Sequence, residues 1–328
     1  MEQYRMNQEP NSANASPKPT NGFMRVWGPL LVKWGVSMAV SFVAIFIFEI
    51  IVLMRDNGLD LASLQNSAKV GELLQQYMSS STEASAFANE IMEVYLKYST
   101  PVEGIAAALT IPILLVMFHK DRIRERIAGI LTNKKASLWK YMFIVIMMAA
   151  VTVGVNNLLQ ISGLAGASEE YEQTMSALYS ASVPVQILCL GILVPVCEEL
   201  VFRGLMFQRM RQSAGFGRAA LYASLVFGLL HVNMVQMIYG FLLGFIFCWL
   251  YEKYGSVKAP VLAHMSANIV SVVMTYAGAM EWLLKDDMRM GVVTVLCATV
   301  ASSMYVLVQR IDEKPEKASQ PEESAEAL

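Results

Sequence analysis

Apolar runs of about 18 to 25 residues recur along the whole sequence, and each is long enough to cross a hydrocarbon core about 30 Å thick as an α-helix. A backbone surrounded by lipid has to satisfy its own hydrogen bonds, so runs of this length favour helices. The chain is 55% hydrophobic and only 16% charged, against about 25% charged residues in an ordinary soluble domain. The sequence therefore predicts an all-α, polytopic transmembrane helical bundle, that is, an integral membrane protein in contact with membrane lipid.

About eight spans are predicted from the length of the apolar runs. They lie at approximately residues 30–54, 101–118, 140–160, 183–207, 218–236, 237–252, 259–278 and 291–309. The sixth span is the weakest, because it is short and follows the fifth with almost no turn between them.

The remaining segments complete the predicted domain organisation. Residues 25–310 form the membrane domain, between a disordered cytosolic tail at residues 1–24 and an acidic disordered tail at residues 311–328. The stretch at about residues 55–100 is a long extracytoplasmic loop. We expect it to contain a helix that lies on the membrane interface, in preference to a lid over a cavity.

Basic residues predict the orientation of the bundle, because cytoplasmic loops of membrane proteins carry an excess of Lys and Arg. The basic positions are Lys120, Arg122, Arg124, Arg126, Lys134, Lys135, Arg209, Arg211, Arg218, Lys253 and Lys258. Alternation of the spans places all of them on one side, and the acidic loop at residues 169–172 on the other. Both termini are therefore predicted to be cytosolic, and we expect the cell membrane of a bacterium. A net charge of −2 and the absence of a basic stripe predict no nucleic-acid partner.

Charged side chains inside the predicted spans are the second unusual feature of the sequence. An Asp, Lys or Arg at the centre of a span costs about 2.5–3.5 kcal/mol or more, and ionisable residues there usually face the bundle interior or a water-filled cavity. The stretch PVCEELVFRG places Glu198, Glu199 and Arg203 in the fourth span. Glu199 and Arg203 are four residues apart, so they are expected to form an ion pair. Glu198 is rotated by about 100° from Glu199 and has no obvious local partner.

Two of the three histidines are predicted to lie in the middle of later spans. FGLLHVN places Phe227 and His231 on one face of the fifth span, and HMSAN places His264 and Asn268 on one face of the seventh. In a cavity, Glu198 can act on water as a general base while His231 holds or polarises that water. His264 and Asn268 can donate hydrogen bonds to a developing oxyanion. The alternative interpretation is a set of packed core histidines and one buried cluster of ion pairs.

The same residues also resemble a metal site. One carboxylate and two imidazoles form a known catalytic zinc combination with one open position, which makes Glu198, His231 and His264 candidate ligands. The one-helix zinc signature HExxH is absent from the sequence. No cofactor is certain from the sequence, and a divalent metal such as zinc and a carboxylate-activated water both stay open.

The order of these motifs resembles the CPBP family of intramembrane proteases, which includes type II CAAX prenyl endopeptidases and the bacteriocin-immunity (Abi) homologues. The family motifs EExxxR, FxxxH and HxxxN occur in order, each in a separate predicted span, within about residues 183–275. The resemblance implies that Glu198 is the catalytic carboxylate, His231 its partner on water, and His264 and Asn268 the oxyanion side. It implies supporting roles for Glu199, Arg203 and Phe227. Members of the family are labelled metalloproteases by tradition.

The resemblance predicts an endopeptidase that hydrolyses a peptide bond of a membrane-associated peptide or protein. One alternative is a non-catalytic immunity or scaffold protein with the same fold. The other is a transporter. The sequence gives no internal repeat and no Gly/Pro-broken helices in matching positions, which a transporter would favour. We expect the site to be reached from the cytosolic side. The sequence predicts neither the natural substrate nor the oligomeric state.

Overall fold

The computed structural model describes residues 22–60, 67–77, 79–130, 133–163, 166, 168–231 and 233–312. Seven helices in this part of the chain are long and apolar enough to cross a membrane, and one shorter apolar helix accompanies them. They are α1 (Gly22–Asn57), α4 (Ser99–Ile127), α5 (Tyr141–Ile161), the composite helix Val183–Arg211, α10 (Phe216–Leu229), α11 (Met234–Tyr254), α12 (Lys258–Tyr276) and α14 (Asp287–Gln309). The described residues contain no β-strand. The predicted all-α bundle of about eight spans is therefore confirmed.

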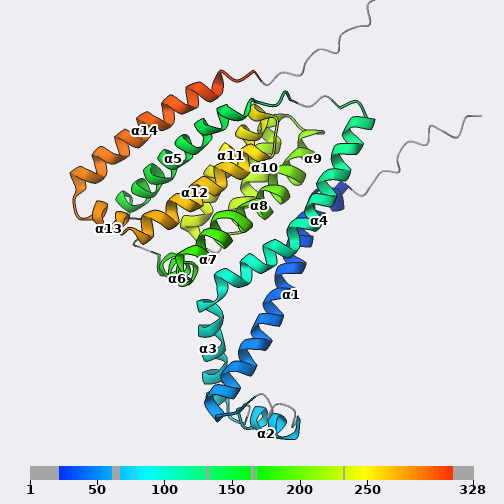
Figure 1. Cartoon of the computed structure of the whole chain (residues 1–328), viewed down its shortest axis with the longest axis vertical. Coiled ribbons are helices and arrows are strands. Elements are labelled where there is room, and N and C mark those ends of the chain that lie inside the picture. The colour runs from blue at the N-terminus through cyan, green and yellow to red at the C-terminus, as the bar shows by residue number, and fades with distance from the viewer. Residues whose placement is uncertain are drawn as a thin grey trace, which may run out of the picture.

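Two groups of helices enclose the composite helix (Figure 1). On one side, α5 packs against both α14 and α12, and α11 packs against α10. On the other side, α1 crosses α4 and contacts the composite helix. The apolar core is divided in the same way, because one buried cluster contains Ile144 and Phe247 while another contains Leu30, Leu114 and Leu205.

The composite helix is not a regular α-helix along its length. Its α-helical parts, α7 (Val183–Leu188), α8 (Val194–Glu199) and α9 (Gln208–Arg211), alternate with two π-helical segments, η4 (Cys189–Leu193) and η5 (Leu200–Phe207). π-Helical turns change which carbonyl each backbone N–H meets, and they are frequent at functional sites. Here they flank the two adjacent glutamates.

The fifth and sixth predicted spans have different boundaries in the structure. Helix α10 has 14 residues, which is about 21 Å and shorter than a full span. The side chain of Asn233 caps α11 by accepting a hydrogen bond from the backbone N–H of Gln236. His231 therefore lies in the turn between α10 and α11, and the prediction that it lies in the middle of a span was wrong.

At Gly228, α10 lies close to the backbone of α11. A Cβ atom there would lie 2.7 Å from the carbonyl oxygen of Met237, on α11. We expect Gly228→Ala to lower the free energy of unfolding by about 1–3 kcal/mol, because the two helices have to separate. Thermal unfolding of the purified protein in detergent measures this. Gly217→Ala, also in α10 but with no atom near the added Cβ, is the control and should unfold at the wild-type temperature or slightly above it; equal losses in both variants would contradict the prediction.

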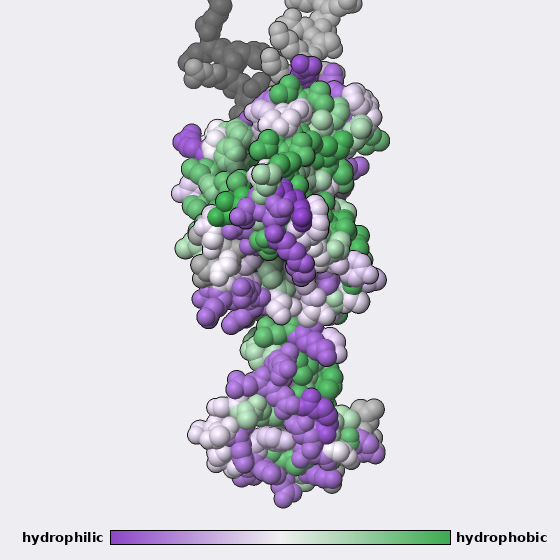
Figure 2. Space-filling view, turned by 90° about the vertical axis from the view of Figure 1, so that its left-hand side faces the viewer, coloured by the Kyte–Doolittle hydropathy of each residue, from purple (hydrophilic) through white to green (hydrophobic). Residues whose placement is uncertain are grey.

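A projection made of α1, α2 (Ser67–Tyr77) and α3 (Ser81–Lys97) extends beyond the bundle, at the end opposite the described termini (Figure 1). Helix α1 has 36 residues, about 54 Å, which is longer than the hydrocarbon core of a bilayer. Its second half runs beside α3, where the hydroxyl groups of Ser41 and Tyr95 are 3.0 Å apart and Arg55 forms an ion pair with Glu90. On the face that Figure 2 shows, hydrophilic residues prevail on this projection.

Helices occupy parts of the predicted loop and of the predicted N-terminal tail. The loop at about residues 55–100 does contain helices, α2 and α3. Helix α1 begins at Gly22, so residues 22–24 of the predicted N-terminal tail are helical. Most of the two predicted tails, residues 1–21 and 313–328, lies outside the described residues.

Both ends of the described chain lie at the same end of the bundle, together with most of the basic loop residues (Figure 1). Arg209 donates to Asp121 on α4 at 2.6 Å, and Arg25 donates to Gln212 at 2.7 Å. This arrangement agrees with the predicted alternation of spans. That this end faces the cytosol stays a prediction.

Candidate active site

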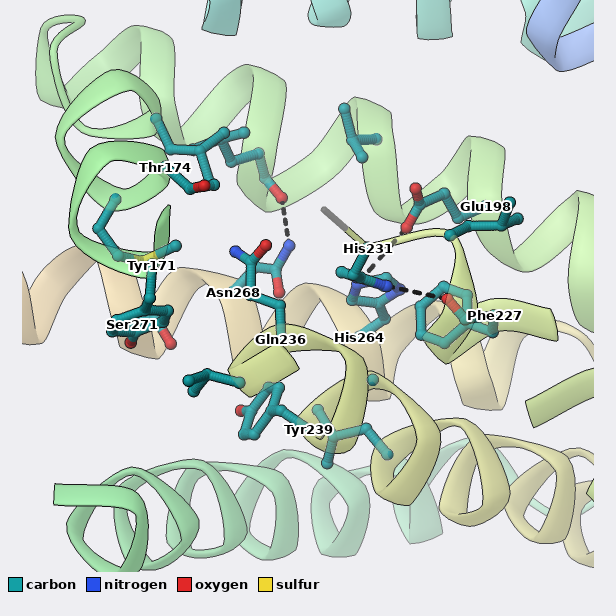
Figure 3. Close-up of a pocket in the computed structure, with 18 of the residues that line it drawn as sticks. Tyr171, Thr174, Glu198, Phe227, His231, Gln236, Tyr239, His264, Asn268 and Ser271 are labelled. Carbon is teal, nitrogen blue, oxygen red and sulfur yellow. Dashed lines mark hydrogen bonds and ion pairs between the residues drawn. The ribbon is translucent and has the colours of Figure 1, made fainter. Parts of the chain in front are cut away.

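The three sequence motifs meet at one cavity of about 680 Å³ inside the bundle (Figure 3). Glu198 reaches it from α8, His231 from the turn after α10, and His264 and Asn268 from α12. Figure 3 shows Glu198, His231 and His264 close together, with Asn268 further along α12. The structure therefore brings together the candidate residues that the sequence placed in three separate spans.

The predicted ion pair between Glu199 and Arg203 is confirmed, and it lies behind the cavity wall. Arg203 Nη1 donates to Glu199 Oε1 at 2.8 Å, and both side chains are fully buried. Arg203 Nη2 also donates to the carbonyl oxygen of Gly244 at 3.1 Å. The guanidinium lies 4.4 Å from the ring centre of Phe227, which adds a cation–π contact. Arg203 thus joins the composite helix to α10 and α11.

Glu199 has a second partner that the sequence did not reveal. The same oxygen, Oε1, is 2.9 Å from His264 Nδ1. Because an ionised carboxylate only accepts hydrogen bonds, Nδ1 carries the hydrogen and donates a hydrogen bond to Glu199. The ring of Phe247 stacks on the imidazole at 5.1 Å. Both contacts fix the ring so that Nε2 faces the cavity, 4.0 Å from Glu198 Oε2.

His231 is held in a comparable way by the end of α10. Its Nδ1 is 2.8 Å from the backbone carbonyl oxygen of Phe227. That carbonyl is among the last four of the helix, which have no partner within it. Nδ1 therefore donates, and Nε2 is the free acceptor of the ring. Gly240 on α11 leaves the space that the ring occupies, since a Cβ atom there would lie 3.0 Å from His231 Cε1.

Asn268 connects α12 to the composite helix. Its Nδ2 donates to the carbonyl oxygen of Leu190 at 2.8 Å, and Leu190 belongs to the π-helical segment η4. One amide hydrogen is thus already used by the protein itself. The role of Asn268 as an oxyanion donor stays a prediction, and the observed contact gives it a structural role in holding η4 against α12.

Lys33 on α1 is the site residue that the sequence interpretation missed. Its Nζ lies 3.7 Å from Glu198 Oε1 and 3.3 Å from Glu103 Oε1 on α4. Glu198 therefore has a charged partner, although none is present on its own helix. A signal did exist in the sequence, because Lys33 and Glu103 are isolated charges within the apolar runs of the first two predicted spans.

The cavity extends toward the end of the bundle that is opposite the described termini. Helix α6 (Glu169–Leu178) borders it there through one face, formed by Tyr171, Thr174, Met175 and Leu178. Asn233 Nδ2 holds this helix through Thr174 Oγ1 at 3.4 Å. Access from the cytosolic side stays a prediction, since lining residues at one end of a cavity do not give its entrance. The lid interpretation of residues 55–100 was wrong, because no described residue of that stretch lines the cavity.

The candidate metal ligands meet only part of the requirement for a metal site. In favour of a metal, both histidines have Nδ1 fixed by an oxygen atom, as metal-binding histidines usually do. Against it, no three His, Cys, Asp or Glu side chains within the described ranges converge closely enough to hold one ion. Glu198 Oε1 is also engaged by Lys33. The residues as placed do not form a three-ligand site.

Comparison with known proteins identifies relatives of the segment that carries the motifs. Residues 180–270 match the family described as "Type II CAAX prenyl endopeptidase Rce1-like". The resemblance to the CPBP family is therefore confirmed over this segment. No solved structure matches the chain.

Two curated relatives are similar to parts of the chain. The Bacillus subtilis (strain 168) protein named "Putative membrane peptidase YdiL" is 27% identical over 129 residues, which is 39% of this chain and 53% of that protein. The Lactococcus lactis subsp. lactis (strain IL1403) protein named "UPF0177 protein YxdF" is 34% identical over 88 residues, 25% of this chain and 48% of that protein. The chain thus spans about half the length of these relatives. Together with the apolar helices, these findings support a membrane protease.

Proposed function

We propose that this protein is an intramembrane endopeptidase in which Glu198 and the two histidines activate water to hydrolyse a peptide bond. One observation carries the proposal. Glu198 Oε2 and His264 Nε2 face each other at 4.0 Å across the cavity, and Glu199 fixes the other nitrogen of the imidazole. That separation is too long for a direct hydrogen bond and leaves both atoms available to a water molecule or a substrate carbonyl group.

Glu198, His231 and His264 have different roles in the proposed hydrolysis. Glu198 accepts a proton from the water whose oxygen attacks the carbonyl carbon of the scissile bond. His231 Nε2 accepts a hydrogen bond from the other O–H group of that water and so orients the water. The tetrahedral intermediate collapses when the C–N bond breaks, and the proton held by Glu198 passes to the departing amine. His264, when protonated on both nitrogens, donates a hydrogen bond from Nε2 to the oxyanion.

The substrate in this proposal is a membrane-associated peptide or protein. A cavity of about 680 Å³ is within the usual range of about 300–1,000 Å³ for a ligand site. Its walls combine apolar side chains with polar groups from several helices, so a short peptide segment can be held in an extended form. No CAAX sequence or prenyl group is required by any contact described above.

Comparative proteomics of membrane peptides tests this function in cells. Cells that produce the wild-type protein are compared with cells that produce Glu198→Gln at the same level. We expect a defined set of peptides or trimmed proteins that is present only with the wild-type protein. Identical peptide sets, with a phenotype that both proteins confer equally, would instead indicate a binding or immunity role.

Removal of divalent metal is expected to leave the activity nearly unchanged. The physical reason is that no three donor groups converge on one point among the described residues. The purified protein is dialysed against a chelator, its metal content is measured, and cleavage rates before and after are compared. Loss of activity on chelation that is restored by zinc alone would contradict this expectation and would make Glu198, His231 and His264 its ligands.

A further inference from the structure

Lys33 is the only lysine or arginine among the cavity-lining residues in the part of the chain that the structure describes. It comes from α1, far outside the matched segment at residues 180–270. Its side chain is 15% exposed, so most of the stem is packed against protein while the ammonium reaches the cavity. A charge in that position is costly in a membrane domain unless it has partners.

The ammonium of Lys33 lies between two carboxylates from different helices. Glu103 on α4 accepts a hydrogen bond from it at 3.3 Å, and Glu198 Oε1 lies 3.7 Å away. The side chain of Glu198 is 18% exposed and that of Glu103 is 39% exposed, so the pair with Glu198 is the more enclosed of the two. Screening by solvent is therefore weaker for Lys33 and Glu198.

The two oxygens of Glu198 have different surroundings as a result. Oε1 is directed to Lys33, and Oε2 is directed to His264. An ion pair at one oxygen of a carboxylate favours conformers that direct the other oxygen away from the cation. General-base catalysis requires such a preferred orientation, because misplacement by about 1 Å can cost about 100-fold in rate.

We propose that Lys33 is a positioning residue of the active site, which acts through Glu198 and is itself held by Glu103. This inference rests on the proposed function and extends it, because it makes the site composite. The segment with the three motifs supplies the reacting groups, and the first helix supplies the cation that orients the carboxylate. A variant of the protein without α1, α2 and α3 would then lack a complete site.

A purely structural ion pair would have a different arrangement. The pair of Glu199 and Arg203 is fully buried behind the wall and does not line the cavity. Lys33 lines the cavity, and Glu103 alone would be enough to neutralise it. The distance of 3.7 Å between Lys33 Nζ and Glu198 Oε1 is what connects Lys33 to the proposed catalytic carboxylate.

Steady-state kinetics with Lys33 variants test the proposal. The full chain is purified in detergent micelles and offered a library of internally quenched peptides with apolar cores, and a peptide that the wild-type protein cleaves becomes the probe. We expect Lys33→Met to reduce kcat by about 10- to 100-fold and to change KM by no more than about twofold. Lys33→Arg keeps the charge and should regain most of kcat. Lys97→Met, in an exposed residue outside the cavity, should match the wild-type protein.

The outcomes separate this proposal from the proposed function. Wild-type kcat in Lys33→Met, with Glu198→Gln inactive, would overturn the role of Lys33 and leave the protease function standing. Cleavage of the probe by a folded Glu198→Gln variant would instead overturn the protease function. An Arg variant as slow as the Met variant, or a loss confined to KM, would show a packing or binding role and also overturn the proposal. If Lys33→Met does not fold, Lys33→Gln is measured in its place against the same criteria.

Discussion

Glu198→Gln is expected to reduce kcat for peptide cleavage by about 10²- to 10⁴-fold, which is the range that a positioned general base supplies. Glutamine has nearly the same shape as glutamate but cannot accept a proton from water at neutral pH. The fold should survive, because Glu198 is a wall residue of the cavity and Lys33 keeps its hydrogen bond to Glu103 at 3.3 Å. The effect should therefore fall on catalysis and not on insertion or stability.

Three measurements on the purified protein define this result. They are kcat and KM with a cleaved probe peptide, the unfolding temperature in detergent, and the amount of protein in the membrane fraction. Glu172→Gln serves as the matched control, because this carboxylate on α6 does not line the cavity. It should retain the wild-type kcat. A correctly folded Glu198→Gln protein with wild-type kcat would exclude Glu198 as the base.

Much of the fold is predictable because the length of an apolar run is a direct consequence of bilayer thickness. The prediction is less accurate at α10 and α11. The turn between them contains Leu230 and His231, without a Gly or Pro to interrupt the apolar run. Asn233 was the available signal, since asparagine is a preferred helix N-cap. With that cap recognised, His231 would have been placed in a turn and not within a span.

The residues of the candidate site were predicted from its motifs, but their individual contacts were predictable only where they are local in sequence. The pair of Glu199 and Arg203 follows from their spacing on one helix. The contacts of Glu199 with His264 and of Lys33 with Glu198 depend on how separate helices pack, and no spacing rule gives them. The contact of Asn268 with Leu190 also depends on the π-helical segment η4, whose presence is not apparent from the sequence.

Arg203→Met is expected to cause the largest loss of stability among the variants considered. Removing one partner of a buried ion pair leaves the other charge without compensation, which costs about 3–5 kcal/mol. Glu199 would be that charge, fully buried and left with the hydrogen bond from His264 Nδ1 alone among the contacts described. The variant would also lose the hydrogen bond to Gly244 and the contact with the Phe227 ring. We expect most of the protein to be unfolded or degraded, as measured by yield in the membrane fraction and by unfolding temperature in detergent.

A double variant separates the charge from the packing. In Glu199→Gln combined with Arg203→Met, no uncompensated charge is left, and replacing a buried ion pair as a whole is often nearly neutral for stability. Most of the lost stability should therefore return. Activity should not, because His264 Nδ1 would then face a neutral amide in place of the carboxylate 2.9 Å away. A stable but inactive double variant would show that Glu199 acts on His264 as well as on Arg203. Equal instability of the single and double variants would mean that the shape of the arginine, and not the paired charge, holds the three helices together.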